Sequence, residues 1–228
     1  MTRSERFRAV LPKAKRVRPV APTARPTFQS AFVEGERGAV VRYAHYIHRH
    51  GSTSTASGGP LHAAFLAALR ESAYQGEIAE DEASRVVFST DNSIYQMAPQ
   101  AVLFPRSRGD LVQIARLAGE PRFVDIRLTM RGGGTGTNGQ SLNAGLVVDT
   151  SRHMNRILSI DPAKRRAWVE AGVVKDQLNR ALKPYGLFFA PELSTSNRAT
   201  IGGMVSTDAC GQGSCLYGKT SNHVLALR

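Results

Sequence analysis

The residues best suited to bind a ligand form a glycine-rich stretch, RGGGTGTNG at residues 131–139, here called the glycine loop. Glycine permits a positive φ and a close approach of the backbone, so successive amide groups can turn toward one anion. Thr135, Thr137 and Asn138 add side-chain donors. A diphosphate suits these donors, whereas a plain hairpin turn needs only one or two glycines. The pattern therefore predicts a phosphate-binding loop.

A second polar region lies at residues 191–223, PELSTSNRATIGGMVSTDACGQGSCLYGKTSNH. It is rich in Ser, Thr, Asn and Gly and has too few apolar residues for a buried element, so we expect a long loop. Loops of this length inside a domain are usually functional. Two anion-binding loops on one chain favour a ligand that spans both, and a dinucleotide has that size.

Two nucleotide-binding motifs also match by their letters. Gly134, Gly136 and Gly139 give the dinucleotide pattern GxGxxG, but that pattern requires a helix to follow, and residues 146–148 read as a strand. Gly213 to Thr220 gives the P-loop pattern, but the residues before it are too polar for the buried strand that a P-loop requires. We interpret both matches as accidental and keep a P-loop nucleotide-binding protein as an alternative function.

Metal and thiol chemistry are poorly supported. Three histidines within residues 45–50 suggest zinc, but no cysteine lies near them and the neighbouring arginines would repel a cation. We therefore expect no metal site. Cys210 and Cys215 are the two cysteines of the chain, and they offer neither a disulfide framework nor a redox pair.

Composition indicates a globular protein with a basic arm. The chain has 228 residues, 42% of them hydrophobic, and a net charge of +12. Residues 1–26 hold eight Lys and Arg, one Glu and four Pro, so we expect a flexible solvated arm that carries +7 of that charge. A noncatalytic basic binding module stays as a second alternative, although we expect no nucleic-acid partner. No apolar run reaches the roughly 20 residues of a membrane helix, and without an export signal we expect a cytoplasmic protein, with peripheral attachment to the inner membrane as the other location.

The elements that must position the glycine loop alternate along the chain. Residues 27–90 predict a helical lead-in, with a short helix at 43–50, a flexible Ser/Thr/Gly insert at 51–59 and a helix around 61–69. Beyond it we expect strands at 101–104, 123–130 and 145–149, a helix from Ser107 to Gly119, a hairpin of 156–160 with 167–170, and a helix at 173–182. Strands follow one another across the glycine loop without the helix that a doubly wound parallel sheet requires, so we predict an α+β fold.

Residues 91–228 resemble a known family. The motifs RGGGTGTNG, VVDTSRHMNRI, FFAPELSTSNRATIGGM, TDACGQGS and YGKTSNHV follow one another as in the FAD-binding domain of the vanillyl-alcohol oxidase and p-cresol methylhydroxylase type, the PCMH-type domain. The closest resemblance is to bacterial FAD and iron–sulfur D-2-hydroxyglutarate dehydrogenases, relatives of D-lactate dehydrogenases and glycolate oxidase.

The resemblance implies a cofactor and its site. It implies a domain of two α/β subdomains with FAD lying across them and its pyrophosphate at the glycine loop. The flavin and its ribityl chain would lie along the second polar region. The implied cofactor-binding residues are Arg131, Gly132, Gly133, Gly134, Thr135, Gly136, Thr137, Asn138, Gly139, Pro191, Thr200, Ile201, Gly202, Gly203, Thr207, Gly211, Tyr217 and Gly218. The loop has no histidine, which implies noncovalent FAD.

The resemblance also implies a reaction. It is the oxidation of a D-2-hydroxy acid to the 2-oxo acid, with D-2-hydroxyglutarate as the first expected substrate and D-lactate as the next. Electrons would pass to the respiratory chain or an electron carrier, and the full-length form would be a homo-oligomer. The catalytic base is not identifiable in these residues. We expect the domain to be cut off at its C-terminal end, where residues 224–227 read as a strand, with the substrate domain and the iron–sulfur ligands outside this chain and no activity for the chain alone.

Overall fold

The computed structural model describes residues 59–228. The predicted basic arm at 1–26, the short helix at 43–50 with its histidines, and nearly all of the insert at 51–59 lie outside the described residues. The part of the chain that the structure describes contains no helix long and apolar enough to cross a membrane.

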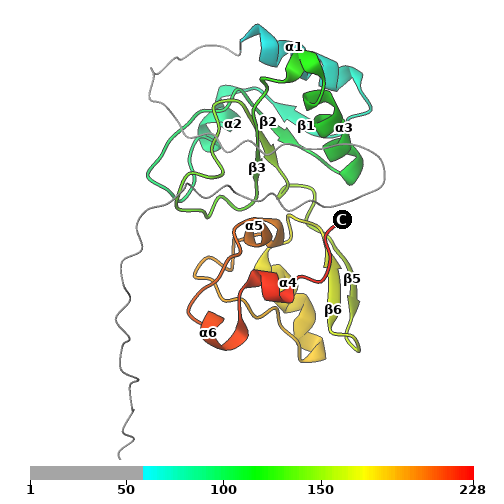
Figure 1. The fold of residues 1–228 in the computed structure, drawn as a ribbon, viewed down its shortest axis with the longest axis vertical. Helices are drawn as coiled ribbons and strands as arrows, with labels where there is room; N and C mark the ends of the chain where they lie inside the picture. The colour runs from blue at the N-terminus through cyan, green and yellow to red at the C-terminus, as the bar shows by residue number, and fades with distance from the viewer. Residues whose placement is uncertain (1–58) are drawn as a thin grey trace, which may run out of the picture. The chain divides into compact units, whose positions relative to one another are not determined.

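A four-stranded sheet supports the glycine loop (Figure 1). Its strands are β1 (Glu77–Ala79), β2 (Ala101–Phe104), β3 (Leu128–Arg131) and β4 (Leu146–Asp149), in the order β1-β2-β4-β3. The strands β2, β4 and β3 are parallel, and β1 pairs with β2 in the antiparallel sense. All residues of β2 and β4 are buried, as expected for parallel strands covered on both faces.

The connection between β3 and β4 differs from a hairpin. These two strands are neighbours and parallel, with Leu128 opposite Leu146 and Arg131 opposite Asp149. Parallel neighbours require a connection that runs back along the sheet. As predicted, no helix lies between them, so the loop itself makes this crossing. The predicted strand at 123–130 is too long at its start, because Pro121–Phe123 forms a 3-10 turn and the strand begins at Leu128.

Helices cover both faces of this sheet. On one face lie α1 (Pro60–Glu71) and α3 (Arg108–Ala118), whose side chains form a core with the strands and with Phe123. Phe65 contacts Phe123 edge to face, with 5.3 Å between ring centroids. On the other face α2 (Glu82–Val87) leads to Phe88, which packs against Phe104.

The predicted start of α3 is confirmed in detail. The Ser107 hydroxyl accepts a hydrogen bond from the Asp110 amide at 3.2 Å, and Asp110 accepts one in return from the Ser107 amide. The buried Asp110 carboxylate also accepts hydrogen bonds from the amides of Arg106 and Gln75, both at 2.7 Å. A single side chain thus fixes the helix, the end of β2 and the loop after α1.

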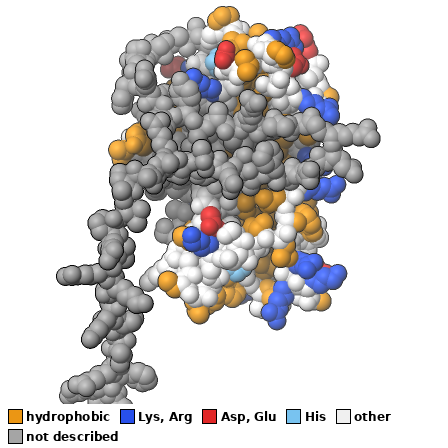
Figure 2. Space-filling view, in the orientation of Figure 1, with side chains coloured by type: hydrophobic (Ala, Val, Ile, Leu, Met, Phe, Trp, Pro, Cys, Tyr) orange, Lys and Arg blue, Asp and Glu red, His pale blue; other side chains and the backbone are white. Residues whose placement is uncertain are grey.

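A hairpin and a helix follow the sheet. The predicted hairpin is confirmed as β5 (Ile157–Asp161) and β6 (Arg166–Val169), and the next helix is α4 (Lys175–Leu182), continued by a 3-10 turn at Lys183–Tyr185. Val173, Leu178 and Leu182 form the core between them. Hydrophobic side chains also reach the surface, as the orange patches of Figure 2 show, and Trp168 on β6 is 50% exposed. Only one face of the hairpin therefore contributes to this core.

The polar region at 191–223 is less irregular than predicted. It contains the short helices α5 (Ile201–Ser206) and α6 (Ser214–Tyr217) and a 3-10 turn at Thr220–His223. These helices could not be predicted from the sequence, because their small residues give no apolar periodicity. The predicted strand at 224–227 is wrong, since these residues pair with no strand of the described chain.

Candidate functional site

The glycine loop presents a row of unpaired amides. Within the described residues, none of the six amides from Gly132 to Thr137 donates a hydrogen bond to the protein, and the hydroxyls of Thr135 and Thr137 make none either. Residues 131–136 are half-buried, so water reaches these donors only in part. Unpaired donors in such a position favour a bound acceptor. Gly134 has φ 62°, as predicted for a loop that turns its amides inward.

The loop lies against a distant part of the chain, residues 195–203, here called the docking segment. A side-chain carbon at Gly132 would overlap the Thr200 hydroxyl, and one at Gly133 would overlap the Arg198 carbonyl oxygen. The Arg198 guanidinium approaches the Gly133 carbonyl at 3.5 Å. Contact with the protein, rather than with a phosphate, is therefore the direct reason for glycine at these two positions.

Residues 90–97 brace the other side of the loop. The Asn92 amide donates to the Gly134 carbonyl at 3.0 Å, and the Ser141 hydroxyl donates to Asp91 at 2.8 Å. A side-chain carbon at Gly139 would lie 2.9 Å from the Tyr95 ring. Sequence reasoning missed this brace. The polar turn Asp91-Asn92-Ser93 could have indicated a role in hydrogen bonding, but its sequence does not show which residues it contacts.

Arg131 places a positive charge at the start of the loop. Its guanidinium donates to the Thr90 carbonyl at 2.8 Å and stacks over Phe88. Burial lowers the pKa of Arg131, the carboxylates of Asp149 and Asp91 raise it, and the nearby positive charge of Arg198 lowers it. In the described chain neither Arg131 nor Arg198 forms an ion pair with a carboxylate. Two guanidinium groups thus flank the row of amides.

The predicted residues at the start of α5 hold the docking segment together. The Ile201 and Gly202 amides donate to Val173 and Ala171 carbonyls, both at 2.8 Å, and the Gly203 amide donates to the Thr200 hydroxyl. The Thr207 hydroxyl donates to the Gly203 carbonyl at 3.0 Å. These donors are used within the protein, so the structure gives the residues a positioning part. Their contact with a cofactor stays a prediction.

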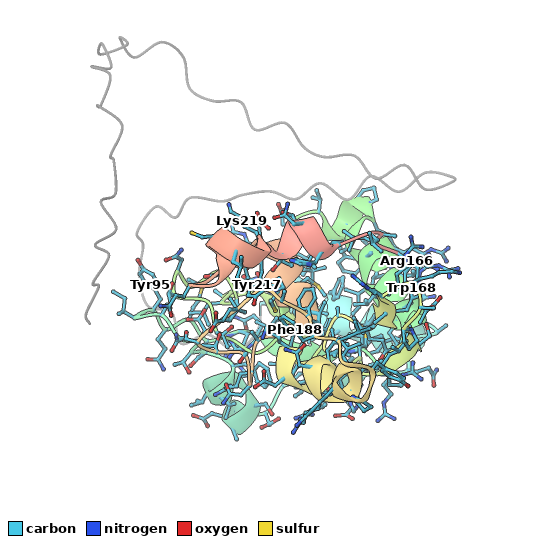
Figure 3. The ribbon with its side chains drawn as sticks, turned by 90° about the horizontal axis from the view of Figure 1, so that it is seen from below. Tyr95, Arg166, Trp168, Phe188, Tyr217 and Lys219 are labelled. Carbon is cyan, nitrogen blue, oxygen red and sulfur yellow. The ribbon has the colours of Figure 1, made fainter. Side chains whose placement is uncertain are left out.

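Among the remaining predicted residues, Gly211 lines a pocket. The pocket has a volume of about 330 Å³ and is lined by residues 192–195 and 210–212. Pro191 is buried beside it, and Gly211 lies so close to the Glu192 carbonyl that no side chain fits. Tyr217 meets Phe188 edge to face, at 5.7 Å between centroids, in the stretch before Gly218 (Figure 3). No residue of the glycine loop lines this pocket, but Thr195, which belongs to the docking segment, does.

Lys219 and His223 have structural partners. The Lys219 ammonium lies 3.8 Å from the Asp208 carboxylate, and His223 contacts the Tyr217 carbonyl oxygen at 2.7 Å. Cys210 and Cys215 are exposed free thiols. These contacts fix the turn around α6. In the described chain, no hydrogen bond joins Lys219 or His223 to the glycine loop.

The geometry excludes both nucleotide motifs in their usual meaning. A P-loop is a loop between a buried strand and a helix. Gly213 instead caps the short helix α6, and the element directly before it in the described chain is the helix α5 rather than a strand, so the P-loop alternative is wrong. After Gly139 the chain enters β4 rather than a helix, which confirms that GxGxxG is not a dinucleotide fingerprint here.

The donor set of the glycine loop suits an anion with several acceptor oxygens. Six amides, two threonine hydroxyls and two guanidinium groups lie along one loop. The diphosphate of a dinucleotide provides acceptors of that number and charge. Among the described residues no cluster of His, Cys, Asp and Glu could hold a metal ion. The residues present therefore fit a diphosphate.

Comparison with known proteins agrees with this fit. A family model described as an FAD binding domain matches residues 99–228. The chain belongs to this family. Over 163 residues it is 65% identical to D-2-hydroxyglutarate dehydrogenase of Pseudomonas putida, and over 164 residues it is 61% identical to that of Escherichia coli K12. It is also 34% identical over 151 residues to glycolate oxidase subunit GlcD of Bacillus subtilis, covering 65% of this chain and 31% of that protein.

Solved structures show the same fold. The chain superposes on 6-hydroxy-D-nicotine oxidase from Arthrobacter nicotinovorans with a TM-score of 0.56 and 25% identity, over 66% of this chain and 32% of the other. For alkyldihydroxyacetonephosphate synthase the TM-score is 0.61 at 20% identity, over 70% and 32%. The predicted PCMH-type FAD-binding fold, with mixed α/β content, is thereby confirmed.

This chain spans only a small part of the length of the related enzymes. The matched region spans 72% of this chain but 16% of the D-2-hydroxyglutarate dehydrogenases of Pseudomonas putida and Escherichia coli. The family model supports the predicted cofactor, FAD.

Proposed function

We propose that this chain supplies the flavin-binding part of an FAD-dependent dehydrogenase that oxidises a D-2-hydroxy acid to the 2-oxo acid. D-2-hydroxyglutarate is the first candidate substrate and D-lactate the second. The 65% identity to an enzyme named D-2-hydroxyglutarate dehydrogenase supports the substrate class. The unpaired amides of residues 132–137 carry the assignment of the diphosphate to the glycine loop.

Each part of the proposed site has its own task. When bound, FAD supplies the hydride acceptor for oxidation of the alcohol carbon. The amides of the glycine loop bind the diphosphate, and Thr200 and Arg198 hold the loop in place. The pocket at 192–195 and 210–212 receives another part of the cofactor. We assign no described side chain as the base for the hydroxyl proton, so that base is expected outside residues 59–228.

Titration of the 228-residue chain with FAD tests the proposal. We expect the flavin fluorescence to be quenched with a Kd below tens of micromolar. The glycine loop contains no histidine, so acid precipitation should release all flavin into solution. Absence of quenching at tens of micromolar FAD would overturn the proposal.

The cellular context belongs to the same proposal. The electrons pass on to the respiratory chain or to an electron carrier, and the longer polypeptide forms a homo-oligomer. Iron–sulfur clusters are usually held by four cysteines, whereas this chain has two, so any cluster is held elsewhere. Exposed free thiols at Cys210 and Cys215 suit the reducing cytoplasm. Assays with D-2-hydroxyglutarate, D-lactate and an artificial acceptor are expected to show no turnover by the chain alone.

A further inference from the structure

Arg198 occupies a position that the sequence did not single out. It is exposed, it belongs to the docking segment, and its guanidinium reaches the Gly133 carbonyl at 3.5 Å. Of its five N–H donors this contact uses one at long range. No carboxylate of the described chain lies within ion-pair distance of it.

The backbone that carries Arg198 is held from two sides. The Lys175 and Asp176 amides, at the start of α4, donate to the carbonyls of Ala199 and Ser196 at 2.9 and 3.1 Å. On the other side the Arg198 carbonyl contacts Gly133 so closely that the glycine tolerates no side chain. A residue fixed in this way brings its guanidinium to the glycine loop at Gly133, although it comes from a segment more than sixty residues away.

The charge around the loop is unbalanced. Arg131 and Arg198 are close enough for their positive charges to repel, and Arg131 has Asp149 and Asp91 nearby whereas Arg198 has no carboxylate partner in the described chain. Like charges at short range are unfavourable unless an anion lies between them. The unpaired amides of residues 132–137 lie at the same place.

We propose that Arg198 is a cofactor-binding residue, which pairs with the diphosphate of FAD at the glycine loop. This inference rests on the proposed function and adds a residue to it. The planar guanidinium of arginine suits two phosphate oxygens at once, which lysine cannot reproduce. The contact joins the docking segment to the cofactor directly.

The test measures binding rather than activity. The Arg198→Gln, Arg198→Lys and wild-type chains are titrated with FAD, ADP and riboflavin. Arg180→Gln is the matched control, because Arg180 is an exposed arginine of α4 that forms no ion pair in the described chain, and the charge change is the same. Thermal unfolding shows whether each variant keeps its fold.

We expect Arg198→Gln to weaken FAD and ADP binding by about tenfold to hundredfold and to leave riboflavin, which has no phosphate, unchanged. The FAD affinity of Arg198→Lys should lie between those of Arg198→Gln and wild type, and the FAD affinity of Arg180→Gln should equal that of wild type. Equal FAD affinity of Arg198→Gln and wild type would overturn the role of Arg198 but not the proposed function. The same holds if Arg198→Gln weakens riboflavin binding as much as FAD binding, or if Arg180→Gln weakens FAD binding equally. Failure of the wild-type chain to bind FAD would overturn the proposed function as well.

Discussion

Replacing Gly133 with alanine tests whether the glycine loop is held against the docking segment. A methyl group at this position would overlap the backbone carbonyl oxygen of Arg198. A backbone atom cannot rotate away as a flexible side chain can, so either the loop or the segment must shift. Gly133 is not among the glycines with positive φ, which means that the substitution tests steric overlap and adds no backbone strain.

The expected loss follows from this overlap. Forcing one methyl group into such a contact costs about 1–3 kcal/mol of the free energy of unfolding. For a domain of this size each kcal/mol lowers Tm by about 2–4 °C. Gly186→Ala is the matched control, because Gly186 has φ 66° and open space around it. Its left-handed backbone should cost about 1–2 kcal/mol with no effect on the loop.

Circular dichroism melting with and without FAD separates the two variants. Gly133→Ala should lose both stability and FAD affinity, because the displaced loop no longer presents residues 132–137 together. Gly186→Ala should lose a similar amount of stability and bind FAD as wild type does. If Gly133→Ala keeps the wild-type Tm and FAD affinity, the loop does not contact the docking segment in solution.

Three further substitutions test other parts of the structure. A methyl group at Gly136 would contact only the flexible end of the Gln140 side chain, so Gly136→Ala should change Tm little. The FAD affinity should fall by about tenfold or more, because the methyl group blocks close approach of the phosphate. Unchanged FAD affinity would mean that the diphosphate does not bind at this amide. Asp110→Ala removes the acceptor of three amides and should cost about 3 kcal/mol in urea denaturation, and a loss below about 1 kcal/mol would contradict its bridging role. Hydrogen bonds from Arg152, then His153 and Arg106, lower the pKa of Glu77. Because the pKa of Glu77 is lower in the folded state, its ion pairs stabilise the fold above the pKa of the unfolded state, and this stabilisation is lost as pH falls through the folded pKa. The difference in Tm between wild type and Glu77→Gln should therefore shrink below about pH 4.5. A constant difference in Tm would argue against these ion pairs.

Local signals in the sequence predicted much of the fold. Ser107 and Asp110 indicate the start of α3, and the Asp161-Pro162 turn indicates the hairpin. The apolar run after Gly145 indicates β4. In each case neighbouring residues determine the structure through capping, turn geometry or burial. The glycine loop was found for the same reason, since its composition is itself local evidence.

Contacts between distant residues could not be predicted in this way. The Gly133 contact with Arg198 joins positions 65 residues apart, and Asp91 meets Ser141 across 50. No pattern in either stretch names its partner. That Gly132 and Gly133 allow close approach to phosphate stays a prediction, and it did not include the protein contacts that require glycine at these two positions.

These contacts link cofactor binding to the packing of the domain. The residues that leave amides free for a diphosphate, Gly132 and Gly133, are also those that touch Thr200 and Arg198. A ligand that binds the loop in this arrangement stabilises the arrangement by mass action. Binding of FAD should therefore strengthen the contact between the glycine loop and the docking segment, and a change that separates them must weaken FAD binding by the same free energy. In the proposed site the glycines would therefore act on the cofactor twice, through their own amides and through the position of Arg198.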